Sequence, residues 1–250
     1  MGLFVGQNVI TLPSVDSTNE YLKAELSKST PVVEGTVIMA VEQVAGRGQK
    51  GATWHSEAGK NLTFSVLFNP VFLHPSNQFR LTVAISLALA HWLESVLQYP
   101  VSIKWPNDSY VDGRKIAGIL VENMLKGQTW KSAIVGIGIN VNQTDFPVGA
   151  ARRPCSIKQF LHRDSNIPEL LSDLCNYLEQ EYLALKNGGH EAQLAQYKQR
   201  LYRLGEPHPF LIDGVQVTGM LCGVTETGKL MIDFNGHVAA FDIKEVEFVF

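Results

Sequence analysis

The sequence has few cysteines and little charge of either sign. Only three of its 250 residues are cysteine, namely Cys155, Cys175 and Cys222, and none of them forms a C-x-x-C pair. Scattered cysteines in odd number suit neither a disulfide framework nor a zinc site, so we expect a reduced, cytoplasmic protein without a metal site of its own. Charged residues make up 18% of the chain and the formal net charge is −3. These values exclude a strongly basic protein that would be drawn to nucleic acid.

Long apolar runs are missing as well. The first residues contain neither the basic segment nor the apolar stretch that a signal peptide requires. The most apolar segment runs from Leu81 to Leu93, and Thr82, Ser86 and His91 interrupt it. It is too short and too polar to span a bilayer. The 45% hydrophobic content of the 250 residues is enough for the core of a globular protein with a small second domain.

The order of the expected elements predicts an α+β fold. Residues 36–42, 61–68, 101–105, 116–124 and 130–141 have strand patterns, and residues 16–27, 78–98, 167–186 and 190–204 have helical patterns. Ser17 and Glu20 have the spacing of a capping box at the first helix. After Leu204 the helical periodicity stops, and short strand patterns separated by Asp213-Gly214, Thr227-Gly228 and Asn235-Gly236 indicate a small β-barrel. We therefore divide the chain near Gly205, into residues 1–204 and 205–250.

The most informative motif is the run Gly46-Arg47-Gly48-Gln49-Lys50-Gly51, which Ala52-Thr53-Trp54 follows. Glycine lets backbone N–H groups approach a ligand closely, and arginine and lysine bind anions. The pattern G-x-G-x-x-G also occurs in Rossmann dinucleotide enzymes, where it opens a helix. Here it leads into an expected strand instead. The motif indicates a loop that closes over a phosphate or a carboxylate.

Four further segments carry polar residues or glycines, and each has an ordinary structural explanation when taken alone. Ser17-Thr18-Asn19 fits a helix N-cap, and Lys104-Trp105-Pro106-Asn107-Asp108 fits a surface turn. Lys115 fits a solvated cation beside a turn. Gly136 and Gly138 inside an apolar strand fit a bulge, although they also suit a close approach to the backbone.

The joint occurrence of these segments, in this order, resembles the biotin protein ligases. The matching signatures are V-D-S-T-N, E-Q-V-A-G-R-G-Q-K-G-A-T-W, G-K-N-L-T-F-S, K-W-P-N-D, G-R-K-I-A-G-I-L-V-E and G-I-G-I-N-V-N. Specific motifs cover residues 8–142, and the resemblance continues more weakly to the end of the chain. It implies a mixed-sheet catalytic domain of the class II aminoacyl-tRNA synthetase and biotin ligase type, with flanking helices and a C-terminal SH3-like β-barrel.

Members of this family activate biotin with ATP to biotinyl-5′-AMP and then transfer biotin to one lysine of a biotin carboxyl carrier protein. The resemblance therefore implies ATP and biotin as substrates, Mg²⁺ with the ATP, and such a carrier as the partner. It implies no nucleic acid or membrane partner, and either a monomer or a homodimer. Because the Ser-Thr-Asn motif begins at residue 17, we expect no DNA-binding domain before it and no repressor activity.

The resemblance also assigns roles to individual residues. Lys115 would contact both the biotin carboxylate and the α-phosphate, and Asp108 would accept a proton from the incoming lysine or orient its amine. Trp54 would anchor the folded glycine loop by packing. The catalytic positions are Lys115, Arg47, Asp108, Asn107 and Lys104. The biotin positions are Ser17, Thr18, Asn19, Gln43, Arg47, Gly48, Gln49, Lys115, Gly136 and Gly138. The nucleotide positions are Gly46, Arg47, Gln49, Lys50, Trp54, Asn107, Lys115 and Asn140.

Gln49 departs from the family pattern, in which many members carry an arginine that helps to retain the adenylate. Glutamine keeps a hydrogen-bond donor but has no charge, so we expect Arg47, Lys50 and Lys115 to retain the intermediate. Two other functions stay open. A lipoate or octanoate ligase or transferase on the same scaffold would need a longer, linear apolar tunnel. A biotin- or nucleotide-sensing binding module would have little use for Lys104, Asp108 and Lys115 together.

Overall fold

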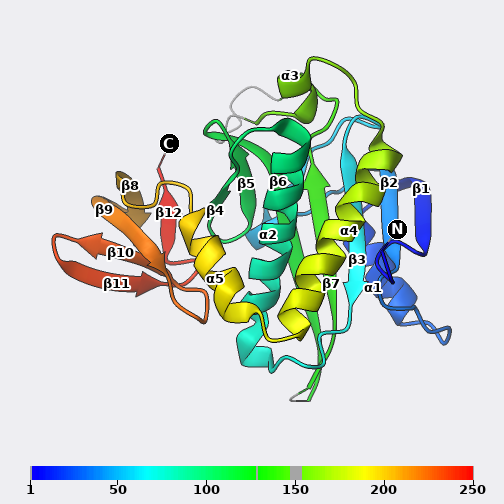
Figure 1. Ribbon diagram of the computed structural model, residues 1–250, viewed down its shortest axis with the longest axis horizontal. Helices are drawn as coiled ribbons and strands as arrows, with labels where there is room; N and C mark the ends of the chain where they lie inside the picture. Colours follow the sequence, from blue (N-terminus) through cyan, green and yellow to red (C-terminus); the bar gives the residue numbers. More distant parts are fainter. Residues whose placement is uncertain (1, 128, 147–153, 250) are drawn as a thin grey trace.

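The architecture consists of a seven-stranded mixed sheet and a separate five-stranded antiparallel sheet (Figure 1). A computed structural model describes residues 2–127, 129–146 and 154–249 of the chain, except for the side chains of residues 50 and 126. The large sheet has the order β1-β2-β3-β7-β6-β5-β4 and the small one β11-β10-β9-β8-β12. The strands are β1 (Val9–Val15), β2 (Val37–Gln43), β3 (Leu62–Phe68), β4 (Ser102–Lys104), β5 (Asp108–Val111), β6 (Arg114–Lys126), β7 (Thr129–Ile139), β8 (Pro207–Ile212), β9 (Val215–Val224), β10 (Leu230–Phe234), β11 (His237–Phe241) and β12 (Val246–Phe248).

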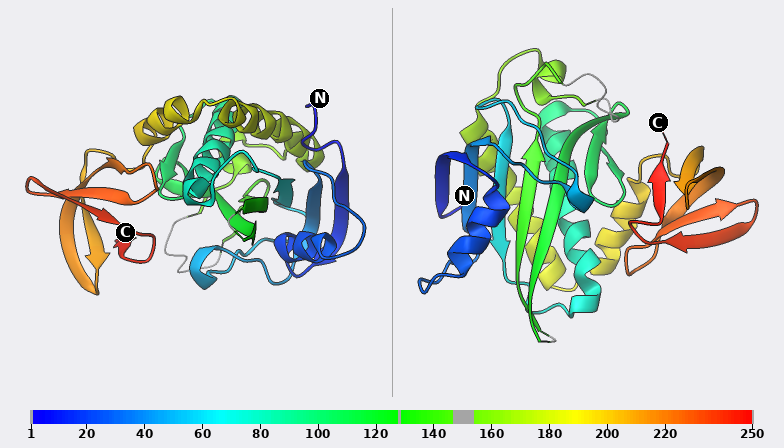
Figure 2. Two further views of the ribbon diagram at one scale, coloured as in Figure 1. Left: turned by 90° about the horizontal axis from the view of Figure 1, so that it is seen from below. Right: turned by 180° about the vertical axis from the view of Figure 1, so that it is seen from behind.

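Helices cover both faces of the large sheet. The helices are α1 (Thr18–Leu26), α2 (Gln78–Leu97), α3 (Ile157–Leu161), α4 (Ile167–Lys186) and α5 (His190–Gln199). Figure 2 shows α2, α4 and α5 on one face and α1 on the other. Strand β1 runs parallel to β2, and the remaining neighbours in the large sheet are antiparallel. The α+β fold predicted from the sequence is confirmed.

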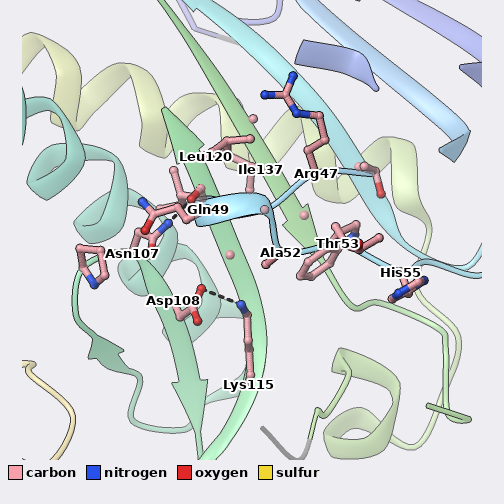
Figure 3. A pocket seen from close by; sticks show the side chains of 18 of the residues that line it. Arg47, Gln49, Ala52, Thr53, His55, Asn107, Asp108, Lys115, Leu120 and Ile137 are labelled. Carbon is pink, nitrogen blue, oxygen red and sulfur yellow. Dashed lines mark hydrogen bonds and ion pairs between the residues drawn. The ribbon is translucent and has the colours of Figure 1, made fainter. Parts of the chain in front are cut away.

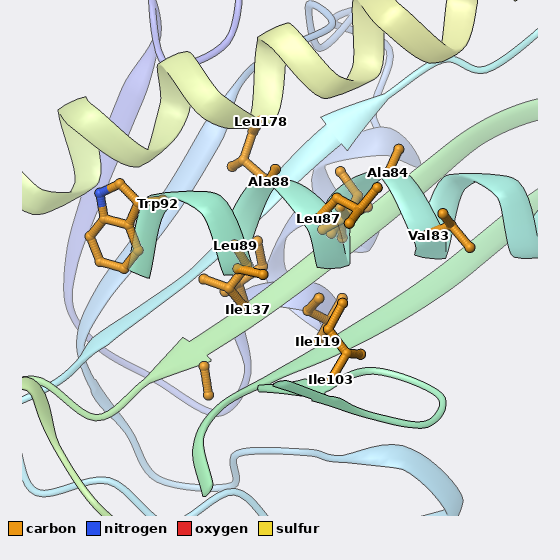
Figure 4. Close-up of a cluster of buried hydrophobic side chains, with 14 of the residues drawn as sticks. Val83, Ala84, Leu87, Ala88, Leu89, Trp92, Ile103, Ile119, Ile137 and Leu178 are labelled. Atoms are coloured by element: carbon orange, nitrogen blue, oxygen red, sulfur yellow. The ribbon is translucent and has the colours of Figure 1, made fainter. Parts of the chain in front are cut away.

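Helix α2 is the centre of the hydrophobic core. It lies beside α4 on one face of the sheet, with Leu87 and Leu89 packed toward the strand residues Ile119 and Ile137 (Figure 4). The helical stretch Pro75–Leu97 is long and apolar enough to cross a membrane by length and composition; one 18-residue window in it has a mean hydropathy of 1.3, and 67% of that window is buried inside the protein. Burial against α4 and the sheet therefore accounts for the apolar character of this helix.

The alternation of side chains along β3 separates the core from the opposite face of the sheet. Phe64 and Val66 belong to the core under α2, whereas Leu67 packs with α1 in a second, smaller cluster. Because successive side chains of a strand point to opposite faces, Thr63 and Ser65 lie on the α1 face. They pair there with Gly138 and Gly136 of β7. This polar, glycine-bearing part of the α1 face is where the functional cleft forms.

The structure also corrects three expectations. The capping box is wrong, because Ser17 occupies the N-cap position of α1 without a side-chain cap hydrogen bond. The last expected helix, 190–204, ends at Gln199 instead. Strand β1 was not predicted, because Pro13 cannot donate to a ladder and so weakens the strand pattern; an edge strand tolerates it.

Tight turns of the Asp-Gly and Asn-Gly kind join strands in both sheets. In the large sheet, Asp112 and Gly113 have φ values of 51° and 67° and join β5 to β6. Asp213-Gly214 and Asn235-Gly236 have positive φ values as well, and they join β8 to β9 and β10 to β11. Two consecutive left-handed residues match the twist of antiparallel strands, which is why Asp-Gly and Asn-Gly are favoured there.

Candidate active site

A cleft of about 980 Å³ opens between the α1 face of the large sheet, the glycine loop and the small sheet. Of the residues predicted for the site, it is lined by Ser17, Thr18, Asn19, Gln43, Arg47, Gly48, Gln49, Trp54, Lys104, Asn107, Asp108, Lys115, Gly136, Gly138 and Asn140. Gly46 is buried behind the loop, where a Cβ would lie 2.4 Å from the carbonyl oxygen of Trp54. The predicted side chain of Lys50 lies outside the described residues.

One end of the cleft is lined by neutral polar side chains, beside which Arg47 and Glu122 form an ion pair. The start of α1 brings Thr18 to the end of β2, where Gln43 Oε1 accepts hydrogen bonds from the Thr18 amide at 2.8 Å and from its hydroxyl at 3.0 Å. The Ser65 hydroxyl lies 2.7 Å from Thr18 Oγ1 and 2.5 Å from Asn19 Oδ1. Thr18, Asn19 and Ser65 are buried and Gln43 is partly buried. Their orientations are fixed by one another, so these groups suit a neutral polar ligand edge rather than an ion.

The two glycines of β7 make room for side chains of the protein itself. A Cβ on Gly136 would lie 2.4 Å from Asn19 Oδ1, and a Cβ on Gly138 would lie 2.5 Å from Trp54 Cε2. The close approach that the sequence suggested is therefore present. Asn19 and Trp54 occupy the space beside the two glycines, and Trp54 thereby brings the glycine loop down onto the sheet.

The opposite end of the cleft is charged. Lys115 at the start of β6 and Asp108 at the start of β5 form an ion pair, with 2.6 Å between Nζ and Oδ1 (Figure 3). Their side chains are only 17% and 11% exposed, so water screens the pair weakly. Lys115 Nζ also lies 5.8 Å from the centroid of the Trp54 ring. Burial, followed by the charge of Asp108, raises the pKa of the neighbouring Tyr197 hydroxyl, which donates to the carbonyl of Pro106.

The glycine loop crosses the cleft between these two ends. It connects β2 to β3 and contains a short 3-10 turn, Gln49–Gly51. Figure 3 shows Gln49 beside Asn107 and Leu120, above the Asp108–Lys115 pair, whereas Arg47 points away from that pair. The loop therefore presents the amide of Gln49 toward the charged end of the cleft, and its Arg47 side chain points away from that end.

Arg47 forms ion pairs with two carboxylates that the sequence did not predict for the site. It contacts Glu20 of α1, and its Nη2 lies 3.1 Å from Glu122 Oε1 of β6. Glu122 Oε2 accepts a hydrogen bond from Asn19 Nδ2 at 2.7 Å. Strand periodicity was the available signal for Glu122, because Gly118, Leu120 and Glu122 alternate onto one face of β6, where the first two line the cleft and Glu122 contacts Asn19.

The small sheet supplies the remaining wall, which the sequence alone did not indicate. Ile243, Val246, Glu247 and Phe248 line the cleft, and the Lys104 ammonium lies 4.9 Å from the centroid of the Phe248 ring. Elsewhere the Trp105 indole donates to the carbonyl of Gly228 at 2.9 Å. Side chains from both sheets therefore enclose one cavity.

Comparison with known proteins identifies the class of this fold and site. The sequence profile of the biotin/lipoate A/B protein ligase family matches residues 11–140. The chain is 30% identical to the biotin–[acetyl-CoA-carboxylase] ligase of Paracoccus denitrificans over 226 residues, which are 88% of this chain and 92% of that one. The chain belongs to the biotin/lipoate A/B protein ligase family.

Two further similarities define the extent of the match. The bifunctional ligase/repressor BirA of Bacillus spizizenii is 36% identical over 146 residues, which are 57% of this chain but only 44% of that protein. The biotin protein ligase of Aquifex aeolicus, in a structure with biotin and ATP, superposes with a TM-score of 0.81 at 30% identity and covers 96% of this chain and 98% of that one. The likeness to the Aquifex protein thus includes both sheets.

Proposed function

We propose that the protein is a biotin protein ligase, which converts biotin and ATP to biotinyl-5′-AMP and transfers the biotinyl group to a lysine of a biotin carboxyl carrier protein. One observation carries this proposal: one cleft joins neutral polar groups at Thr18 and Gln43 to a charged end at Asp108 and Lys115. Biotin has the matching polarity, with a neutral ureido edge at one end and a carboxylate at the other. The resemblance to biotin ligases supports the same assignment.

The geometry suits an acyl adenylation. When the biotin carboxylate attacks the α-phosphate of ATP, two anions meet. Lys115, a cation on the cleft wall, would stabilise both of them. Because Asp108 already lies 2.6 Å from Lys115 Nζ, the lysine is positioned before any ligand enters, which reduces reorganisation during the reaction. Asp108 would then accept a proton from the attacking amine of the carrier once Lys115 has turned toward the phosphate. Ser17, Asn107 and Asn140 keep their predicted binding roles within this proposal, and Lys104 and Asn107 keep their predicted catalytic roles.

Magnesium belongs to the proposal through ATP. Within residues 2–127, 129–146 and 154–249, no three His, Cys, Asp or Glu side chains form a metal-binding group. The absence of such a group among the described residues fits an ion that is carried mainly by phosphate oxygens, beside which Asn107 would offer an amide oxygen on the cleft wall. Bound magnesium would neutralise charge on the phosphates. We also propose a cytoplasmic location and a boundary near Gly205 between the two domains.

An ATP–pyrophosphate exchange assay tests the proposal. Biotin should support exchange, and lipoate or octanoate should not, because the cleft ends in polar groups rather than in a linear apolar tunnel. Exchange with lipoate but not with biotin would favour the acyl ligase alternative. Biotin binding without exchange would favour a sensing module. Mass spectrometry of the bound product should identify biotinyl-AMP, and incubation with a carrier domain should label one lysine.

A further inference from the structure

The pairing of Arg47 with two carboxylates gives the glycine loop an attachment to the body of the protein. The three side chains come from three elements: Glu20 from α1, Glu122 from β6 and Arg47 from the loop. Such contacts join the loop to both the helix and the strand beside the neutral end of the cleft. These contacts therefore attach the loop to the body of the protein.

Glu122 is the more buried of the two carboxylates. Its side chain is 23% exposed, against 45% for Glu20. Each of its oxygens has a separate donor, since Oε2 accepts from Asn19 and Oε1 from Arg47. Asn19 is itself buried and lies against Ser65 and Gly136. The cleft floor thus orients Glu122, and Glu122 in turn orients the loop arginine.

We propose that Glu122 is a positioning residue, which holds Arg47 and thereby keeps the glycine loop closed over the neutral end of the cleft. This inference rests on the proposed function for its consequence, namely tighter retention of biotin and its adenylate. The fourth loop position carries the uncharged Gln49, so an attachment through Arg47 supplies an electrostatic hold that Gln49 cannot. The cluster of Glu20, Arg47 and Glu122 has a net charge of −1, which also disfavours a carboxylate at this end and directs it toward Lys115.

Limited trypsin proteolysis of the ligand-free protein tests the attachment directly. Trypsin must take the Arg47 side chain into its own specificity pocket to cut the Arg47–Gly48 bond, so the bond is protected while Arg47 is held. Glu122→Gln keeps an oxygen for Asn19 but loses the charge, and it should accelerate cleavage at this bond by about three- to fivefold, as expected for loss of a largely exposed ion pair. Glu20→Gln should accelerate it less.

The matched control is Glu25→Gln. Glu25 lies on α1 like Glu20 but pairs with Lys28 at 2.7 Å, so its loss should leave cleavage after Arg47 unchanged. Equal cleavage rates in Glu122→Gln and the wild-type protein would overturn the proposal, and so would equal acceleration by Glu25→Gln. Thermal unfolding of each variant shows whether the whole fold, rather than the loop, has been weakened.

Steady-state exchange kinetics test the consequence for the reaction. Glu122→Gln should raise the KM for biotin by about the same three- to fivefold, with kcat nearly unchanged, because the carboxylate acts on loop closure and not on the reacting atoms. A fall in kcat at constant KM would contradict a positioning role. If wild-type protein shows no biotin-dependent exchange but the protection of Arg47 depends on Glu122, the proposed function fails and the attachment stands.

Discussion

Replacing Gly136 by alanine tests how tightly the floor of the cleft is packed. The new Cβ would lie 2.4 Å from Asn19 Oδ1 and 3.0 Å from its Cγ, far inside van der Waals contact. Asn19 cannot rotate away freely, because Ser65 lies 2.5 Å from its Oδ1 and its Nδ2 donates to Glu122 at 2.7 Å. Asn19 must therefore shift by about 1 Å, which is the distance needed to restore an ordinary contact.

Two effects set the size of the change in stability. Inserting a methyl group into a well-packed interior costs about 1–3 kcal/mol, and displacing Asn19 weakens hydrogen bonds worth about 1 kcal/mol each. Replacing glycine within a strand returns about 0.5–1 kcal/mol through the lower entropy of the unfolded chain. We expect Gly136→Ala to lower the free energy of unfolding by about 2–3 kcal/mol and to weaken biotin binding.

A double-mutant cycle separates the collision from other effects. Asn19→Ala removes the amide that the new methyl group would meet, so Gly136→Ala should be nearly neutral in that background. Urea unfolding of the wild type, both single variants and the double variant gives the coupling energy, which we expect to be about 2 kcal/mol in favour of the double variant. If Gly136→Ala alone costs less than about 0.5 kcal/mol, or if its cost is the same with and without Asn19, the close contact is not the cause and the reasoning fails.

Three further variants test other parts of the structure. Gln49→Arg places a guanidinium above Asp108 and should slow adenylate release about tenfold, since a charge-assisted hydrogen bond is worth about 1.5 kcal/mol; unchanged release measured by filter binding would contradict this. Asp108→Asn should slow transfer from preformed biotinyl-AMP about 100-fold if Asp108 is the general base, and a near-normal single-turnover rate would remove that role. Glu179→Ala should lower stability by about 2 kcal/mol, because Glu179 accepts the amides of residues 3–5 at 2.5, 2.6 and 2.9 Å. Burial alone would raise the pKa of Glu179, but these donors outweigh it and lower the pKa below 4.5. The difference from wild type should therefore be full above pH 4.5 and disappear as the pH falls through the lowered pKa; urea unfolding at several pH values measures it.

Local patterns made part of this fold predictable. The Asp-Gly and Asn-Gly turns encode their own backbone conformation, and the long stripes of α2 and α4 define helices without tertiary information. Strand β1 was not predicted, because Pro13 weakens its strand pattern. The position of β1 at the edge of the sheet permits a proline there. The expected capping box failed because Glu20 pairs with Arg47, a residue that is distant in sequence.

The sequence predicted which residues belong to the candidate site better than it predicted how those residues contact one another. The motifs named most of the residues that line the cleft, and Gly136 and Gly138 correctly indicated a close approach to the backbone. The side chains that approach the two glycines are Asn19 and Trp54. Their identity depends on how α1 and the glycine loop pack against β7, which the sequence of no single segment predicts. The ion pairs of Arg47 and the cleft wall supplied by the small sheet likewise depend on contacts between residues far apart in the sequence, so they could not be predicted from local patterns.

The shared cleft wall has a thermodynamic consequence for the two sheets. A ligand that fills the cleft contacts Lys115 of the large sheet and Phe248 of the small sheet. Its affinity therefore depends on the position of the small sheet relative to the large one. By linkage, a ligand that binds more tightly when the small sheet is docked on the large sheet stabilises the docked arrangement by the same factor. Ligand binding in the cleft and docking of residues 205–250 are therefore coupled, and a measurement of one reports on the other.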